Sequence, residues 1–327
     1  MELILATADG REIRSIFDDI DFEIGGENTF QISLDYPTWD GTYKHGRLIY
    51  VPGTEYGGII KDIEGATNTD QIFIRGFTWR GYLAHRIIEP PAGENYKKVS
   101  GELNTVIGSI IGNTFGSLFQ VSTESTGVNV TNYQFDRYTT IDAGLTKMLA
   151  TKGYRLDVKY KQTALSGYVE VSAQPAHNYA DDIEISQDSR LDFNSQDYRM
   201  GINHLICLGE GQLSERIVIH LYADSSGNIS QVQSITGLDE IVDKYDNPSA
   251  DADILLELGE EHFKDLLNFK RFDASMKDID DLDLPIGDTI TGRDYITGNV
   301  VTKPIVLKII RRENGIVTTE YRIEGEE

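Results

Sequence analysis

The sequence predicts an α+β protein that is mainly β, with two related β-barrel domains, an α+β domain between them and a helical insertion in the second barrel. Three observations support this fold class: short β-branched and aromatic runs toward both ends of the chain, turn signals at short intervals between those runs, and few segments with helical periodicity. We expect domains at 1–85, 86–180 and 181–327, with the insertion at about 236–272.

The N-terminal domain is predicted to be all-β. Its strand-like runs within residues 2–77 are LILAT, TFQISLDY, RLIYV, GGIIKDI and QIFIRGF. The turn signals between them are Asp9-Gly10, Gly25-Gly26, Asp40-Gly41 and Pro52-Gly53. These residues tolerate positive φ or preset a turn, and their spacing favours a closed barrel or sandwich over a parallel sheet.

Two helices and a hairpin are expected in the middle domain. Ser100 is a candidate cap for a helix whose apolar face is formed by Leu103, Val106, Ile107, Ile110 and Ile111. Thr140 caps a second helix, with Asp142 in its positive first turn and one stripe formed by Ile141, Leu145, Met148 and Leu149. YRLDVKY and YVEVSA then alternate as the two strands of a hairpin.

The last domain returns to strands at INHLICLG and ERIVIHLYAD. Ser249 is a candidate cap for a long helix whose buried side is formed by Leu255, Leu256, Leu258, Phe263, Leu266 and Leu267. The segments VTKPIVLKIIRR and IVTTEYRIEG then face each other across Asn314-Gly315, a strong hairpin signal.

An internal similarity links the two ends of the chain. GGIIKDI followed by QIFIRG parallels VLKIIRR followed by EYRIEG. Two hairpins of similar length can agree by chance, and a duplicated barrel is the alternative. Two equivalent barrels per chain would let a trimer present six similar units around an axis.

Charge and cysteine content exclude several classes of protein. The 30 basic and 53 acidic residues give a net charge of −23, which repels a phosphate backbone and disfavours nucleic-acid binding. Residues 238–283 hold 15 of the acids and 5 bases, which indicates either a solvated helix surface or an acidic lining.

Cys207 alone cannot form an internal disulfide. The sequence shows neither a signal peptide nor a membrane span, so we expect synthesis in a bacterial cytoplasm.

No catalytic, cofactor-binding or metal-binding residue is predicted, and no cofactor. The sequence lacks a nucleophile elbow, a Walker loop, an H-E-x-x-H motif and paired C-x-x-C motifs. His204 and Cys207 would point to opposite faces of a strand, which favours an exposed imidazole and a buried thiol over a shared metal. The segment Gly209–Gln212 is expected to be a β-turn.

Two acidic features admit other interpretations. Asp278, Asp280, Asp281 and Asp283 suggest a calcium loop, but the required glycine and final glutamate are missing, so a solvated turn is favoured. A glycosidase needs two carboxylates in a cleft, and Trp39 and Trp79 could line one, although barrel and interface positions explain these tryptophans more simply.

Three longer stretches resemble a known family. They are residues 57–88, residues 189–224, and residues 284–315 with the sequence LPIGDTITGRDYITGNVVTKPIVLKIIRRENG. These stretches resemble the tail-hub proteins of siphoviruses that infect Gram-positive bacteria, the ReqiPepy-type tail family within the phage baseplate-hub superfamily. The matching residues are fold signatures and not catalytic motifs.

The resemblance implies a non-enzymatic structural protein of the virion, located at the tail tip. Such a subunit would form a homotrimeric ring that passes DNA transiently without binding it specifically. Its expected partners are a distal tail protein, the tape-measure protein, and tail fibre or receptor-binding components. Some relatives carry a C-terminal peptidase, and none is expected here because the sequence ends at Glu327. The alternatives are a cell-surface or glycan-binding tail module and a cell-wall glycosidase or peptidase.

Overall fold

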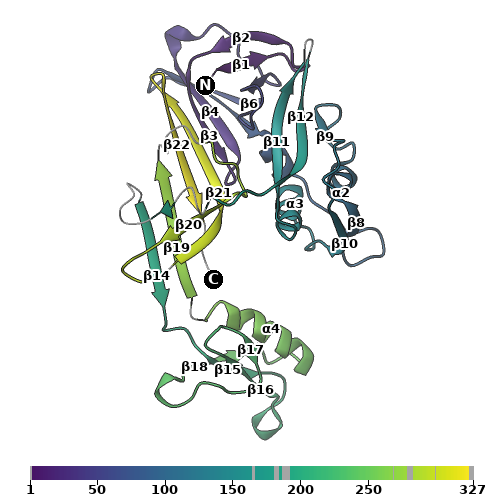
Figure 1. Ribbon diagram of the computed structural model, residues 1–327, viewed down its shortest axis with the longest axis vertical. Coiled ribbons are helices and arrows are strands. Elements are labelled where there is room, and N and C mark those ends of the chain that lie inside the picture. The colour runs from purple at the N-terminus through teal and green to yellow at the C-terminus, as the bar shows by residue number, and fades with distance from the viewer. Residues whose placement is uncertain are drawn as a thin grey trace. The chain divides into compact units, whose positions relative to one another are not determined.

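The computed structural model describes residues 2–163, 166–179, 184–185, 192–267, 269–277, 283–298 and 300–323 (Figure 1). The chain divides into two compact units. Unit 1 comprises Met1–Phe193, Ala274–Arg293 and Val300–Glu324, and unit 2 comprises Asn194–Asp273 with Asp294–Asn299 and Gly325–Glu327.

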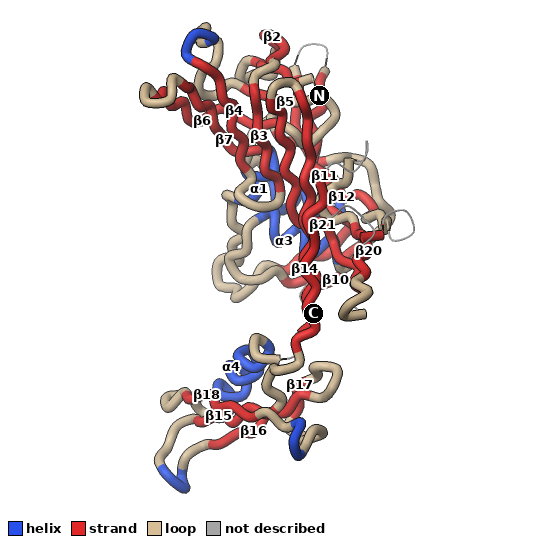
Figure 2. Tube along the Cα trace, turned by 90° about the vertical axis from the view of Figure 1, so that its left-hand side faces the viewer, coloured by secondary structure: helices blue, strands red, loops and turns tan. Residues whose placement is uncertain are grey.

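Most strands of a 13-stranded sheet belong to unit 1 (Figures 1 and 2). Its path runs β14-β19-β22-β21-β3-β4-β7-β6-β5-β1-β2, with β20 paired to β21 and β13 paired to β20. The strands are β1 (Leu3–Ala6), β2 (Glu12–Ile16), β3 (Asp19–Ile24), β4 (Thr29–Asp35), β5 (Leu48–Tyr50), β6 (Gly57–Ala66), β7 (Gln71–Thr78), β13 (Glu184–Ile185), β14 (Asp192–Tyr198), β19 (Phe269–Lys277), β20 (Thr289–Arg293), β21 (Val300–Glu313) and β22 (Ile316–Ile323).

Strands from the two ends of the chain are joined in this sheet. β21 pairs antiparallel with β3, which places Lys308 opposite Ile24 and Arg311 opposite Asp21. The mainly β character and the presence of helices are confirmed. No closed barrel is found among the described strands, so the two predicted barrels are not confirmed. The predicted hairpin across Asn314-Gly315 is confirmed as β21 and β22.

Alternating side chains give the large sheet one apolar and one polar face. In β3, Ile20, Phe22 and Ile24 are buried, whereas the acidic residues between them are partly exposed. β4 repeats this pattern with Phe30 and Ile32. Because side chains alternate with a period of two, the aliphatic and aromatic residues gather on the inner face and the charged residues on the outer face.

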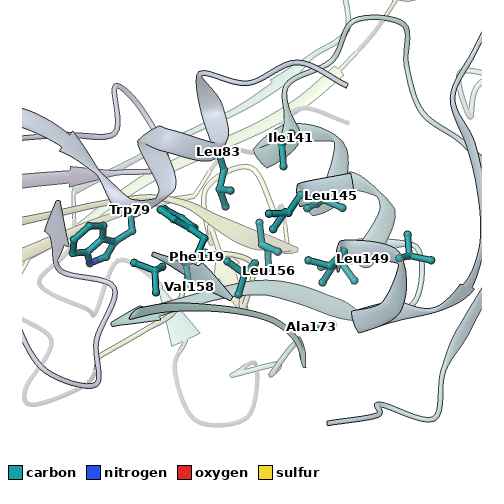
Figure 3. Packing of buried hydrophobic residues seen from close by; sticks show 14 of the residues in the cluster. Trp79, Leu83, Phe119, Ile141, Leu145, Leu149, Leu156, Val158 and Ala173 are labelled. Carbon is teal, nitrogen blue, oxygen red and sulfur yellow. The ribbon is translucent and has the colours of Figure 1, made fainter. Parts of the chain in front are cut away.

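The rest of unit 1 is an α+β layer. Its helices are α1 (Trp79–Ala84), α2 (Leu103–Ile111) and α3 (Ile141–Ala150), and Tyr36–Thr38 forms a 3₁₀ turn. Its strands are β8 (Lys98–Glu102), β9 (Phe119–Val121), β10 (Asn129–Gln134), β11 (Tyr154–Gln162) and β12 (Gly167–Pro175). β11 and β12 form the predicted hairpin, with β9 parallel to β12. Figure 3 shows Ile141, Leu145 and Leu149 of α3 packed toward Leu156 and Val158 of β11.

The predicted helix caps in this layer have different outcomes. Thr140 caps α3 as predicted, since its hydroxyl accepts from the Ala143 amide at 3.1 Å. Ser100 as the cap of α2 is wrong, because it lies within β8 and the Glu102 carboxylate caps the helix by accepting from Thr105. The helix α1 was not expected from the sequence.

Unit 2 is a small sheet with one helix. Its strands run β17-β16-β15-β18, where β15 is His204–Leu208, β16 is Val218–Ala223, β17 is Ile229–Ser230 and β18 is Val242–Asp246. Two 3₁₀ turns lie at Leu213–Glu215 and Gly237–Asp239. The helix α4 (Ala252–Lys264) lies within the predicted insertion.

The cap of α4 differs from the prediction. Asp251, and not Ser249, accepts from the Ile254 amide at 3.0 Å. Among the described residues, no helix combines the length and the apolar character that a membrane crossing requires.

Candidate assembly surface

The outer face of the large sheet, here called the polar face, carries charged side chains from strands that are distant in sequence. They come from β3, β6, β7, β21 and β22 and include Asp21, Glu23, Asp62, Glu64, Arg75, Arg311, Glu320 and Arg322. Acids and bases alternate along this face, which gives it a mixed charge although the chain is strongly acidic.

Arg75 is held by three groups on this face. Its guanidinium lies 3.0 Å from Asp62 and 2.7 Å from Glu64, and its Nε donates to the Gln31 amide oxygen at 2.6 Å. The hydrogen bond to Glu64 is the largest of the effects that raise the pKa of Arg75, and it outweighs partial burial. The guanidinium is therefore engaged by protein groups.

Arg311 is bound in a similar way on β21. Its Nε lies 3.0 Å from Asp21, and its Nη1 lies 3.6 Å from Glu320. Glu320 also accepts from Arg322 at 3.0 Å. These cations meet carboxylates before they could meet a phosphate, so the polar face offers little attraction for DNA.

A shallow depression of about 420 Å³ lies on the polar face. It is lined by Asp21, Glu23, Thr29, Phe30, Gln31, Lys61, Asp62, Arg75, Gly76, Phe77 and Arg311. Opposite charges and two phenyl rings, over strands in the middle of the sheet, provide contacts of the type found at protein–protein interfaces.

An ionic junction with a buried cation lies at the inner face of the sheet. Lys308 of β21 has a side chain that is 1% exposed, forms an ion pair with Asp283 and lies 3.9 Å from Glu55. The side chain of Asp283 is 63% exposed and that of Glu55 is 13% exposed. Its ammonium lies 4.7 Å from the ring centre of Tyr56 and 5.6 Å from that of Tyr321. A lysine at an inward position is therefore accommodated by two carboxylates and two aromatic faces.

Arg80 of α1 extends this junction toward the α+β layer. Its guanidinium lies 3.6 Å from Glu55 and 2.9 Å from Asp142, and it donates to the Leu156 carbonyl at 2.9 Å. Glu55 is thus shared by Arg80 and Lys308. The junction connects the N-terminal strands, α1, α3, β11 and the C-terminal hairpin.

A further buried ion pair lies in unit 1. The Nε of Arg155 on β11 lies 2.9 Å from Asp288, whose side chain is 2% exposed, and Arg155 also pairs with Asp157. Asp288 accepts from the His177 amide at 2.9 Å. This contact holds β11 to the segment that leads into β20.

Burial and neighbouring charges shift the pKa values of Asp283, Arg80 and Tyr56 in the junction. Burial raises the pKa of Asp283, but the charge and hydrogen bond of Lys308 together with the Tyr56 hydroxyl outweigh burial, so the pKa of this carboxyl is lowered. Burial lowers the pKa of Arg80, but Asp142 and Glu55 outweigh it and raise the net value. Burial, followed by the charge of Asp283, raises the pKa of Tyr56 far above its ordinary value. An ionised Asp283 is a poor proton donor at neutral pH, so this geometry favours a structural role over acid catalysis.

His204 and Cys207 lie on opposite faces of β15, as predicted, but both are buried. Cys207 is buried beside Gly259 of α4, and burial raises the pKa of its thiol to about 11. The predicted exposed imidazole is wrong: His204 is 8% exposed, with Nδ1 2.7 Å from Glu240 and Nε2 2.8 Å from His220. Among the described residues, no three or more histidine, cysteine, aspartate or glutamate side chains are grouped so that they could hold a metal ion.

The remaining predicted residues have varied positions. Asp278, Asp280 and Asp281 lie outside the described residues, whereas Asp283 belongs to the junction. Gly209–Gln212 forms part of the connection between β15 and β16, with the Gly209 amide bonded to Ile217. Trp79 is fully buried in the core, and Trp39 is 38% exposed.

Sequence reasoning missed Lys308 and Arg80. The available signal for Lys308 was its place in VLKII, where alternation puts a lysine on the same face as Ile310. Arg80 carries no such signal, because its partners come from other elements.

No protein-family model matches the sequence, and no curated protein matches it. Solved structures do match its fold. A 43 kDa tail protein of prophage MuSo2 from Shewanella oneidensis aligns with a TM-score of 0.51 and 12% identity, covering 99% of this chain and 98% of that chain. A chain of the phage P2 baseplate in its activated conformation aligns with a TM-score of 0.53 and 8% identity, covering 98% of each chain. The chain has the fold of phage tail proteins. The prophage tail protein gp18 from Listeria monocytogenes aligns with a TM-score of 0.50 and 11% identity, covering 99% of this chain and 94% of that chain.

Proposed function

We propose that this protein is a non-enzymatic structural subunit of a phage or prophage tail, the hub at the tail tip. The observation that carries the proposal is the fold shared over nearly the whole length with two prophage tail proteins and a chain of a phage baseplate. Matches that extend over both chains include the α+β layer and unit 2 as well as the sheet, which favours a common role over the reuse of one domain.

In this proposal three copies form a ring through which DNA passes. The ring joins the tail tube, through a distal tail protein and the tape-measure protein, to tail fibres or other receptor-binding components. The paired arginines of the polar face support DNA passage without retention, because counterion release needs cations free to meet phosphates. The siphovirus ReqiPepy-type assignment, the two-barrel description and the domains at 1–85, 86–180 and 181–327 belong to the same proposal.

The mass of the native assembly tests this proposal. Light scattering over a wide concentration range should give three times the chain mass of 36.6 kDa, and negative-stain images of the same sample should show a threefold ring with an opening. A monomer at every concentration, or a closed dimer, would contradict the ring. Release of fragments from Gram-positive cell walls by the purified protein would contradict the non-enzymatic role.

A further inference from the structure

Among the described residues of unit 2, the helix covers one face of the sheet. The helix α4 packs on the face that holds Leu205 and Cys207, where Leu255 and Phe263 complete a small core. The opposite side, here called the open face, holds the alternate residues of three strands. They are His204, Ile206, Leu208, Val218, His220, Tyr222, Val242, Lys244 and Asp246.

The open face combines exposed valine side chains with aromatic rings that are fixed by stacking and hydrogen bonds. Val218 is 46% exposed and Val242 is 48% exposed, on the two strands that flank β15. The Tyr222 ring stacks on His204 at a centroid distance of 4.4 Å, and His204 is fixed by Glu240 and His220. Ordered rings beside exposed valines form a preorganised surface for contact.

The strand β18 is an edge among the described strands of this sheet. It is parallel to β15, and in a parallel pair alternate residues bond to the neighbouring strand. The Ile241 carbonyl and the Asn247 amide bond to the β15 side. The backbone groups of Val242, Lys244 and Asp246 therefore face away from β15, and the Lys244 amide is bonded instead by the Asp243 side chain at 2.8 Å.

Charge decides which occupant suits this edge. Residues 194–273 hold 15 acidic and 6 basic residues, a net charge of −9. Around β18 the acids Asp239, Glu240, Asp243 and Asp246 outnumber Lys244 and Arg216, of which Arg216 is paired with Asp246. A second copy of unit 2 would bring like charges together, whereas an extended segment rich in lysine or arginine would meet an edge of net negative charge.

We infer that the free edge of β18 and the open face dock an extended, basic, β-branched segment of another protein, which adds to the sheet as a further strand. Main-chain hydrogen bonds to Val242 and Asp246 would hold the segment, and its alternate apolar side chains would lie beside Val242 on the open face. The inference rests on the proposed tail role only for the source of the partner, which would be a neighbouring tail protein.

A peptide-binding measurement on the full chain tests this inference. The probe is a labelled peptide of alternating lysine and valine, with an otherwise equal peptide of alternating glutamate and valine as its control. Fluorescence anisotropy should show the lysine peptide binding at least about tenfold more tightly than the glutamate peptide. Hydrogen exchange should slow at the Val242 and Asp246 amides when the lysine peptide is bound.

Matched variants locate the binding to the edge. Val242→Pro removes the outward amide and should weaken binding by about tenfold or more, and proline is tolerated on an edge strand with its nitrogen toward solvent. Val232→Thr alters a valine that is 75% exposed and lies outside β18, and it should bind as the wild type does. Circular dichroism and unfolding curves confirm that both variants fold.

Several results would overturn the inference. They are equal binding of the two peptides, undiminished binding by Val242→Pro, and slowed exchange in unit 1 instead of β18. Self-association of the wild type that Val242→Pro abolishes would also overturn it, because the occupant would then be a second copy. Failure of ring formation in light scattering would leave these readouts unaffected, so the two proposals can fail separately.

Discussion

One strand carries two cations with opposite environments. On β21, Lys308 points to the inner face with a side chain that is 1% exposed, and Arg311, three residues later, points to the polar face with a side chain that is 41% exposed. Each lies near two carboxylates, Lys308 near Asp283 and Glu55, and Arg311 near Asp21 and Glu320. The two cations therefore differ greatly in burial, whereas each lies near one exposed and one largely buried carboxylate: Asp283 is 63% and Glu55 13% exposed, and Asp21 is 44% and Glu320 11% exposed.

The difference in burial indicates which cation contributes more to the stability of the fold. Removing one partner of a buried ion network costs about 3–5 kcal/mol, because the remaining charge is left in a medium that solvates it poorly. An exposed pair contributes about 0–1 kcal/mol, because water and salt replace the lost partner. We infer that the junction around Lys308 stabilises unit 1 and that the polar face around Arg311 is available for assembly.

The largest effect is expected for Lys308→Ala. The variant leaves Asp283, which is 63% exposed, without its cation and leaves Glu55 with Arg80 alone. It should lower the free energy of unfolding by about 2–3 kcal/mol, which is less than for a fully buried network because water can solvate Asp283. The measurement is urea unfolding at pH 7 followed by circular dichroism. Arg311→Ala is the matched control on the same strand and should lose less than about 1 kcal/mol. Similar losses for the two variants would remove the distinction between the faces.

Removing the charge of Asp283 together with that of Lys308 is expected to restore most of that loss. The double variant Lys308→Met and Asp283→Asn removes the cation and the acid paired with it, and it keeps Glu55 as a partner of Arg80. Its free energy of unfolding should return to within about 1 kcal/mol of the wild type, because well-packed neutral groups often replace an ion pair at little cost. Lys308→Met alone is the control and should remain less stable than the double variant. A double variant as unstable as the single one would show that packing, and not charge, causes the loss.

The junction should also contribute a pH dependence. Because the folded pKa of Asp283 lies below its unfolded value, its contribution to stability is present above about pH 4 and is lost as the pH falls through the folded pKa. The difference in unfolding free energy between wild type and Lys308→Met should therefore be constant above about pH 4 and narrow below it. Urea unfolding at several pH values measures this difference. A difference that widens toward acid would assign it to another group.

Local signals predicted much of this fold. The stripe Ile141, Leu145, Met148 and Leu149 with its Thr140 cap gave α3 correctly, because cap and periodicity lie within one short segment. Asn314-Gly315 placed the last hairpin for the same reason. The two wrong helix caps also have local causes. Ser100 lies within β8, and Asp251, two residues after Ser249, has an equally good capping side chain. The six-residue helix α1 is too short for a periodic pattern.

Long-range pairing could not be predicted in the same way. The sequence separation between Glu55 and Lys308, or between Asp21 and Arg311, exceeds any local pattern. Both contacts exist because β21 pairs with β3, so that the two ends of the chain form one sheet. Unless the register of β21 with β3 is known, an inward lysine in VLKII looks like a break in the apolar pattern. The charged residues of β3 then look like an ordinary solvent-exposed face.

The smallest effect is expected on the polar face itself. Arg75→Gln removes the contacts to Asp62 and Glu64, which are more than half exposed, and should change the free energy of unfolding by less than about 1 kcal/mol. Any difference from the wild type should shrink further in 1 M salt, because the Debye length is then about 3 Å. Urea unfolding at low and high salt measures both values, with Lys308→Ala as the comparison whose loss should persist in salt. A large, salt-resistant loss for Arg75→Gln would mean that the polar face also holds the fold together, and that its charges are less available to a partner than the exposed geometry indicates.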